Sequence, residues 1–283
     1  MKYLLPLATL LLFFGCAKEK TAEAPPATTT QETTTTAAET QPPPLQPQHP
    51  ITLPAGAPIP ANGVLLWLAA DDAVAKDGGK FQSWQNVKAL HNDQLPAVVP
   101  NAINGHAVVR FDGTDQQLMA NISIAPAQMP EGTVISVFRS ATADASPLRK
   151  LYGDDNGGYD RAAGLDDRAE GKNFTVFTGN GVEGYFQLAA NTTYVLVDEY
   201  ASNEFSGWVN GAPALTKVAA AWGANPDDAL PNLYLGGTGT SYAEYWNGDL
   251  AEIIVYARKL TDAERAQVVG YLAKKYGAAI TSP

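Results

Sequence analysis

The chain has 283 residues and is acidic, with 19 lysines and arginines against 29 aspartates and glutamates and a formal net charge of −10. A surface that binds nucleic acid needs a concentration of positive charge, so this balance argues against nucleic acid as a partner. A single cysteine excludes an intrachain disulfide, and the fold must therefore rest on its apolar core.

The N-terminal segment has the pattern of a secretion signal. An apolar run covers residues 3–14, and at about a dozen residues it is shorter than the ~20 that a membrane-spanning helix needs. The run ends at Gly15 and Cys16, and a small residue directly before the only cysteine resembles a bacterial lipobox. We therefore predict a signal peptide over residues 1–15 and a lipid on Cys16. The alternative is ordinary signal cleavage that leaves an incidental cysteine.

The segment that follows predicts a tether. Residues 16–62 are rich in proline and threonine and contain almost no large apolar residue before Leu45. Such a segment cannot bury enough apolar surface to fold, so we predict a disordered linker. Because Ala17 is not aspartate, the resemblance to bacterial lipoproteins places the anchor in the outer membrane. The lipid would then be the only membrane contact of a protein in the bacterial cell envelope.

Residues 63–283 predict one domain that is rich in strands. An apolar run at residues 64–68 is bounded by turn residues, and Asn210-Gly211 is the pair preferred in two-residue hairpin turns, with strands expected at 205–209 and 212–215. Further short runs of aromatic or β-branched residues lie at 133–138, 174–177, 185–188, 194–197 and 233–235. Many short strands between Gly and Asn turns predict an all-β fold, a β-sandwich of the jelly-roll type.

The C-terminal stretch predicts a buried strand followed by one amphipathic helix. Residues 250–256 are β-branched and aromatic, as in a buried strand. Thr261 and Glu264 have the spacing of a capping box, and Gly277 can end the helix in a left-handed conformation. One helical face is apolar and should pack on the sheet, through Ala266, Val269, Leu272, Ala273 and Tyr276.

Two blocks of this domain resemble a known family. The C-terminal block reads Gly-Asp-Leu-Ala-Glu-Ile-Ile-Val-Tyr over residues 248–256, then Leu-Thr-Asp-Ala-Glu-Arg, then a helix that ends in Tyr-Leu-Ala-Lys-Lys-Tyr-Gly. The front block has Leu-Trp-Leu-Ala-Ala-Asp at 66–71, then a Ser-Trp pair, then Asn-Gly-His-Ala-Val-Val-Arg-Phe-Asp-Gly at 104–113. Both resemble bacterial laminin-G-like domains of the concanavalin A-like lectin/glucanase superfamily. The resemblance implies a concanavalin A-like jelly roll and the binding of carbohydrate or protein.

Catalytic signatures do not accompany this resemblance. Glycoside hydrolases work with two carboxylates, and the laminarinase-like branch of the superfamily carries them as Glu-x-Asp-x-x-Glu on one strand. No glutamate between residues 131 and 264 has an aspartate two positions later. The three histidines, His49, His91 and His106, do not have metal-ligand spacing. We therefore predict that the domain is not an enzyme.

Two groups of residues are candidates for ligand binding. Within the acidic stretch 150–168, four side chains can offer oxygens to calcium, namely Asp154, Asp155, Asn156 and Asp160. The alternative is a solvated turn, since Asp, Asn and Gly tolerate left-handed backbone. Four aromatic residues near Gly, Asn and Ser segments can stack on sugar rings, namely Trp222, Tyr242, Tyr245 and Trp246, or they can cap the edge of the sandwich. Three further tryptophans are expected in the core, namely Trp67, Trp84 and Trp208.

Together these patterns predict a surface-tethered lipoprotein whose β-sandwich binds a glycan or a cell-surface protein without catalysis. Two alternatives stay open at this point. The domain could be a structural or interaction module of the envelope with no small ligand, or a divergent polysaccharide-degrading enzyme. These patterns predict no particular cofactor, although calcium could bind the acidic stretch.

Overall fold

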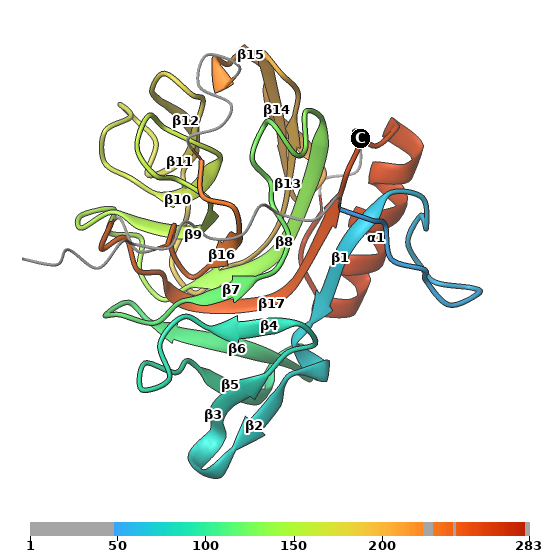
Figure 1. Ribbon diagram of the computed structural model, residues 1–283, viewed down its shortest axis with the longest axis vertical. Helices are drawn as coiled ribbons and strands as arrows, with labels where there is room; N and C mark the ends of the chain where they lie inside the picture. Colours follow the sequence, from blue (N-terminus) through green and yellow to red (C-terminus); the bar gives the residue numbers. More distant parts are fainter. Residues whose placement is uncertain (1–47, 223–228, 240–241, 281–283) are drawn as a thin grey trace, which may run out of the picture. The chain divides into compact units, whose positions relative to one another are not determined.

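The computed structural model describes residues 48–222, 229–239 and 242–280, in which strands dominate (Figure 1). The strands are β1 (Val64–Ala69), β2 (Val74–Lys76), β3 (Lys80–Ser83), β4 (Val87–Ala89), β5 (Ala97–Ile103), β6 (His106–Asp112), β7 (Leu118–Ala120), β8 (Gly132–Ser140), β9 (Arg149–Gly153), β10 (Ala162–Leu165), β11 (Phe174–Phe177), β12 (Val182–Phe186), β13 (Thr193–Tyr200), β14 (Glu204–Val209), β15 (Ala212–Ala219), β16 (Leu233–Leu235) and β17 (Asn247–Tyr256). The helix α1 (Asp262–Tyr276) follows β17.

The strands form two antiparallel sheets. The larger sheet has ten strands in the order β15-β14-β13-β8-β17-β6-β5-β3-β2, with β1 paired to β17. The smaller sheet has seven strands in the order β12-β11-β10-β9-β16-β7-β4. Several neighbouring strands, such as β8 and β17 or β9 and β16, come from distant parts of the chain, so the chain passes repeatedly from one sheet to the other. This architecture confirms the predicted all-β sandwich with a C-terminal helix.

Both faces of the larger sheet are buried at its centre, because the smaller sheet and α1 cover opposite sides (Figure 1). Successive residues of a strand point to opposite faces. In β8, Val134 and Phe138 belong to the cluster between the sheets, whereas Ile135 and Val137 pack beneath α1. This explains why the sequence of β8 reads as a nearly continuous apolar run.

The ends of α1 confirm the sequence signals. Thr261 and Glu264 form both hydrogen bonds of the capping box, and Gly277 takes the left-handed conformation with φ 66°. The buried face differs at one position, because Val268 is buried and Ala266 is exposed. At 100° per residue, Val268 lies about 40° around the helix from the fully buried Leu272, whereas Ala266 lies about 120° away.

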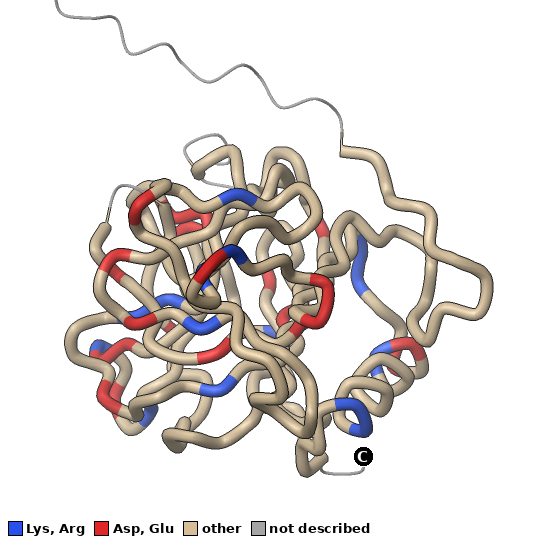
Figure 2. Tube along the Cα trace, turned by 90° about the horizontal axis from the view of Figure 1, so that it is seen from below, with Lys and Arg blue, Asp and Glu red and all other residues tan. Residues whose placement is uncertain are grey.

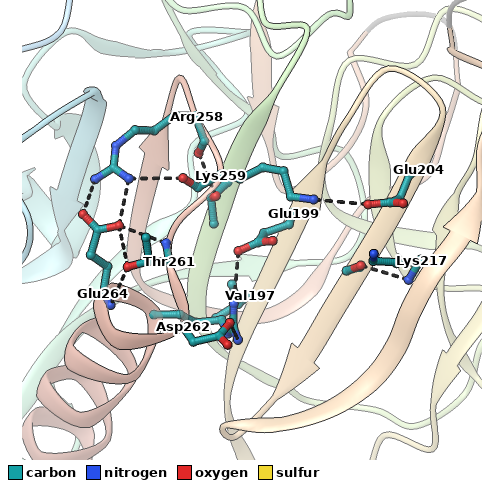
Figure 3. Close-up of polar contacts among 12 residues, drawn as sticks. Val197, Glu199, Glu204, Lys217, Arg258, Lys259, Thr261, Asp262 and Glu264 are labelled. Atoms are coloured by element: carbon teal, nitrogen blue, oxygen red, sulfur yellow. Dashed lines mark hydrogen bonds and ion pairs between the residues drawn. The ribbon is translucent and has the colours of Figure 1, made fainter.

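Ion pairs connect the start of α1, and the segment before it, to the larger sheet (Figure 3). The guanidinium of Arg258 donates to both carboxylate oxygens of Glu264, at 2.6 and 2.9 Å. Lys259 pairs with Glu204 of β14 at 3.2 Å. Arg265 contacts Glu199 of β13 at 3.3 Å. Along the described part of the trace, acidic and basic positions are interspersed, and the last turn of α1 is basic (Figure 2).

The tryptophans expected in the core divide into two groups. Trp84 is fully buried between the sheets, and its indole N–H donates to the carbonyl of Ala69 at 2.8 Å. Trp67 and Trp208 are only half-buried, because they lie on the opposite face of the larger sheet at the margin of α1. There the guanidinium of Arg265 lies 3.7 Å from the centre of the Trp208 ring.

The domain starts before the predicted boundary at residue 63. The side chain of Gln48 exchanges two hydrogen bonds with the backbone of Ser123, at 2.8 and 3.0 Å. The N–H of Ile51 donates to the carbonyl of Val64 at 2.7 Å, and Ile59 is 3% exposed. Gln48, Ile51 and Ile59 therefore contact the sandwich, although most residues of 48–62 are exposed, so contacts of the domain begin before residue 63. A disordered linker over the preceding residues stays a prediction. The few apolar side chains of residues 48–62 are dispersed among prolines. The sequence therefore shows no strand pattern that would indicate contact with the sandwich.

The predicted signal peptide, Cys16 and the linker up to residue 47 lie outside the described residues. Within the described residues, no helix is long and apolar enough to span a membrane. The predicted hairpin is confirmed, because Asn210 and Gly211 both have positive φ, at 51° and 85°, as a type I′ turn requires.

Candidate functional site

A pocket of about 300 Å³ lies where the β9–β10 loop, the end of β11 and the segment before β17 meet. We call it the tyrosine pocket, and its lining residues are Asp155, Gly157, Gly158, Tyr159, Arg168, Phe177, Tyr242 and Glu244. The lining combines aromatic rings with groups that donate and accept hydrogen bonds. This is the composition of sites that orient small polar ligands.

The β9–β10 loop is shaped by its own carboxylates. Asp155 Oδ1 accepts a hydrogen bond from the N–H of Asp160 at 2.9 Å, and Asp160 Oδ2 accepts one from the N–H of Asn156 at 3.0 Å. Tyr159 has φ 65°, and its carbonyl accepts a hydrogen bond from Gly179 at 2.8 Å. The bonds from Asp160 N–H to Asp155 and from Asn156 N–H to Asp160 close the loop and fix where the Tyr159 ring projects.

Three aromatic rings contribute to the tyrosine pocket. Tyr159 and Phe177 meet edge to face with 5.4 Å between ring centres, and the guanidinium of Arg168 lies 5.3 Å from the Phe177 centre. Tyr242 is 42% exposed, and its hydroxyl lies 3.0 Å from the point that a Cβ on Gly157 would occupy. Glycine at 157 therefore lets Tyr242 approach the loop closely. The pocket thus has one rigid aromatic wall and one accessible ring.

A buried ion-pair network supports the floor of the tyrosine pocket. The Lys150 ammonium contacts Asp166 Oδ2 at 2.9 Å and lies 3.9 Å from the centre of the Phe177 ring. Arg168 donates to both Asp166 oxygens, at 2.9 and 2.6 Å. Burial opposes ionisation of Asp166, but the hydrogen bonds from Arg168 and Lys150 outweigh it and lower the pKa of Asp166. This holds Arg168 in a single orientation beside the aromatic rings.

Two carboxylates of the tyrosine pocket have raised pKa values. Burial raises the pKa of Asp155, against hydrogen bonds from the backbone and the positive charge of Lys150. Burial also raises the pKa of Glu244, and the neighbouring charge of Asp155 adds to that rise. Raised carboxylate pKa values indicate groups that are held out of water and close to one another. Such groups can accept hydrogen bonds from a ligand, or donate when protonated.

Of the four aromatic residues proposed to stack on sugars, the structure brings only Tyr242 to a pocket. Tyr245 is half-buried, and its carbonyl accepts a hydrogen bond from Arg149 at 3.3 Å. Trp222 and Trp246 are 2% and 0% exposed, so their assignment to a ligand-binding surface is corrected. Both face inward and pack against aromatic core residues, Trp246 against Phe138 and Trp222 against Tyr200.

The four proposed calcium ligands lie in different environments and do not form a metal site. Asp154 is fully buried, and the nearby Arg161 partly offsets the rise that burial causes in the pKa of Asp154. Asp155 and Asp160 are 5% exposed and hold the loop, whereas Asn156 is exposed. Across residues 48–222, 229–239 and 242–280, no group of three or more His, Cys, Asp or Glu is placed to hold a metal ion. The alternative, a solvated acidic turn, does not fit this loop either, because Asp154, Asp155 and Asp160 are buried.

Four lining residues were not singled out from the sequence, namely Tyr159, Arg168, Phe177 and Glu244. Phe177 belongs to the short strand predicted at 174–177, and it lines the pocket from the end of β11. Tyr159 follows a Gly-Gly pair, and such a flexible turn before an aromatic residue is the one local signal that could have marked it. Arg168 and Phe177 come together through the pairing of β9, β10 and β11, and Glu244 joins them through the bridge between Lys150 and Tyr245.

Comparisons with known proteins define the fold rather than a family. No family model matches the chain, and no curated protein is significantly similar to it in sequence. Among solved structures, domain 4 of AbnA, a GH43 extracellular arabinanase from Geobacillus stearothermophilus in complex with arabinotriose, matches with a TM-score of 0.51 at 10% identity. That match covers 73% of this chain and 97% of the arabinanase domain.

Two larger proteins match over part of their length. Trypanosoma rangeli sialidase in complex with sialic acid gives a TM-score of 0.53 at 17% identity, covering 81% of this chain and 36% of the sialidase. The binding domain of Paraclostridial Mosquitocidal Protein 1 gives 0.50 at 12% identity, covering 76% of this chain and 55% of that domain. The chain therefore spans about a third and about half of these two structures. At these identities the likeness concerns the β-sandwich fold.

Proposed function

We propose that this domain is a non-catalytic carbohydrate-binding module and that the tyrosine pocket is its glycan site. The observation that carries the proposal is Tyr242, the one large aromatic side chain that is exposed in the described part of the chain. It stands in a pocket whose other members include Arg168 and two carboxylates. The likeness in fold to an arabinanase domain that is in complex with arabinotriose supports the proposal.

The chemistry of a sugar fits both sides of this pocket. The C–H face of a sugar ring packs on a flat aromatic ring, which suits the exposed Tyr242. The hydroxyl groups of the sugar need donors and acceptors, which Arg168, Asp155 and Glu244 supply. A volume of about 300 Å³ lies at the small end of ligand pockets and favours a single sugar unit or the end of a chain.

The test is a glycan array with the purified chain, followed by titration calorimetry on any glycan that binds. Tyr242→Ala should weaken binding about tenfold, because it removes both the apolar contact and the aromatic face. Tyr242→Phe is the matched control, since it keeps the ring and removes only the hydroxyl, and it should retain most of the affinity. A glycan that binds Tyr242→Ala as tightly as the wild type would place the site elsewhere.

One observation favours a second function, the hydrolysis of polysaccharides. Asp155 and Glu244 lie in the same pocket with raised pKa values, and glycoside hydrolases use paired carboxylates of this kind. Asp155, however, is engaged in holding its loop. Incubation with polysaccharides and measurement of new reducing ends tests this function. Release of sugar by the wild type, lost in Glu244→Gln, would overturn the non-catalytic proposal.

We further propose that the domain is a laminin-G-like jelly roll held at the bacterial outer membrane by a lipid on Cys16. The support is the pair of sequence blocks and the Gly15-Cys16 junction described above. Cys16→Ser should abolish labelling by fatty acid and release the protein from the membrane fraction. Labelling that persists in the variant would show that the cysteine is not the anchor. A folded domain with no ligand on the array would favour a structural module of the envelope.

A further inference from the structure

Three charged side chains form a row across the centre of the larger sheet. Strand register places Asp249 of β17 directly between Arg110 of β6 and Arg139 of β8. Arg110 donates to Asp249 from Nε at 2.6 Å and from Nη2 at 3.1 Å. Arg139 donates to Asp249 Oδ2 from Nε at 3.1 Å and from Nη2 at 2.6 Å. Two guanidinium groups therefore converge on a single carboxylate.

This row carries a net charge of +1, and some guanidinium N–H groups are not used in binding Asp249. The side chain of Asp249 is 4% exposed, whereas those of Arg110 and Arg139 are 46% and 25% exposed. Each arginine binds Asp249 through its Nε and Nη2 edge. Within the described residues, no hydrogen bond engages Nη1 of either arginine. Asp249 thus fixes the orientation of both guanidinium groups, and the Nη1 donor of each arginine is left to bind another group.

The three side chains line a pocket of about 300 Å³, which we call the arginine pocket. Asn191 and Asn247 also line it, and their side-chain amides have no hydrogen-bond partner within the described residues. The backbone around them is held firmly, since the N–H of Asn191 donates to the carbonyl of Ser140 at 2.8 Å. The pocket therefore surrounds its space with guanidinium and amide donors on a rigid frame.

We infer that the arginine pocket binds an oxyanion, that is, a carboxylate, sulfate or phosphate group. Planar guanidinium groups match oxyanions through paired hydrogen bonds, and the amide groups can supply further donors. The chain as a whole has a formal net charge of −10, so general electrostatics repels anions. A local set of oriented donors with a positive charge is what an acidic protein needs to retain one.

The site is separate from the tyrosine pocket. Alternation along β6 puts Arg110 on the same face of the larger sheet as Val108, which packs in the cluster beneath α1. The tyrosine pocket instead involves strands of the smaller sheet. The inference therefore does not depend on the proposed glycan site and can hold if that proposal fails.

The test is binding of four probes to the purified chain: sodium sulfate, sodium phosphate, glucuronate and, as the ionic-strength control, sodium chloride. We expect saturable binding of at least one oxyanion at one site per chain. Binding should shift the Nε–Hε signals of Arg110 and Arg139 in NMR spectra and should be absent with chloride. Inorganic sulfate or phosphate as the tightest probe would indicate a free ion, whereas glucuronate would indicate the acidic group of a sugar.

Variants locate the site. Arg139→Gln should weaken oxyanion binding about tenfold or more, because it removes a charge-assisted hydrogen bond. Asn191→Gly removes one amide and keeps the residue's positive φ of 58° accessible, so it tests the pocket in a protein that folds normally. Arg258→Gln is the matched control, since it removes an ion-paired arginine elsewhere and should not change binding. The inference is overturned if sulfate, phosphate and glucuronate act no differently from chloride, or if Arg139→Gln and Asn191→Gly bind as the wild type does.

Discussion

Glu252 is a buried carboxylate on which three elements depend, and its removal should be among the costliest single changes in the domain. It is 0% exposed in β17. Its Oε1 accepts a hydrogen bond from Trp67 Nε1 of β1 at 2.6 Å, and its Oε2 accepts from Lys275 at 2.8 Å and from the Tyr276 hydroxyl at 2.7 Å. The carboxylate therefore joins the end of α1 to β1 across the sheet.

The magnitude follows from what Glu252→Ala leaves behind. The Lys275 ammonium, the Tyr276 hydroxyl and the Trp67 N–H would lose a fully buried acceptor. Lys275 would keep only Asp71, at 3.4 Å, and Tyr276 only the carbonyl of Ala251, at 3.3 Å. Breaking a buried ion pair by removing one partner costs ~3–5 kcal/mol. The free energy of unfolding of a domain is only ~5–15 kcal/mol, so this loss would be a large fraction of it. Glu252→Gln should cost less, since it keeps an acceptor for one of the donors.

Urea denaturation followed by tryptophan fluorescence measures the free energy of unfolding. Glu264→Ala is the matched control, since its capping box and ion pair with Arg258 are partly exposed and should be worth only ~1 kcal/mol. Tyr276→Phe, alone and combined with Glu252→Gln, measures how strongly the two side chains are coupled. A Glu252→Ala variant that loses no more stability than Glu264→Ala would refute the reasoning.

Three further predictions concern the core and the acidic loop. Burial raises the pKa of Asp198 from 3.8 to about 7, so its contribution to stability is present below about pH 4 and is lost as the pH rises to about 7. At 1.36 kcal/mol per pH unit this amounts to at most about 4 kcal/mol. Urea denaturation at pH 5 and pH 8 should therefore show that the free energy of unfolding falls less with rising pH in Asp198→Asn than in the wild type. Equal falls in the two proteins would contradict this prediction. Leu272→Ala removes a fully buried side chain of α1 and should cost ~2–5 kcal/mol in the same assay, whereas a change below ~1 kcal/mol would mean that the helix packs loosely. Because Asp155 and Asp160 are engaged within their loop, millimolar calcium should not raise the melting temperature relative to EDTA, and a rise that Asp160→Ala abolishes would contradict this assignment.

The sequence by itself determined the features that short stretches of chain specify. The capping box at Thr261 and Glu264, the left-handed Gly277 and the Asn210-Gly211 turn were all predictable, because each depends on backbone preferences and on neighbours within a few residues. Apolar runs such as β8 were predictable as well, since a strand that is buried on both faces carries few polar residues. These local signals were sufficient for the fold class.

Burial of polar residues was decided only by the tertiary structure. The stretch 150–168 reads as a solvated acidic loop, yet it contains part of β9 and all of β10, and Asp166 is buried between Lys150 and Arg168. A charged residue can be buried where a partner neutralises it, and the fold determines whether that partner is near. Composition alone therefore cannot distinguish a buried ion pair from a solvated turn.

The two pockets depend on the tertiary structure in the same way. Tyr242 and Trp246 are four residues apart, but one lines a pocket and the other is in the core, because each side chain's environment is set by the strands that pack against it. Asp249 is 139 residues from Arg110 and 110 residues from Arg139. Only the register of β6, β17 and β8 aligns these three charges, and register depends on which apolar face of each strand is buried.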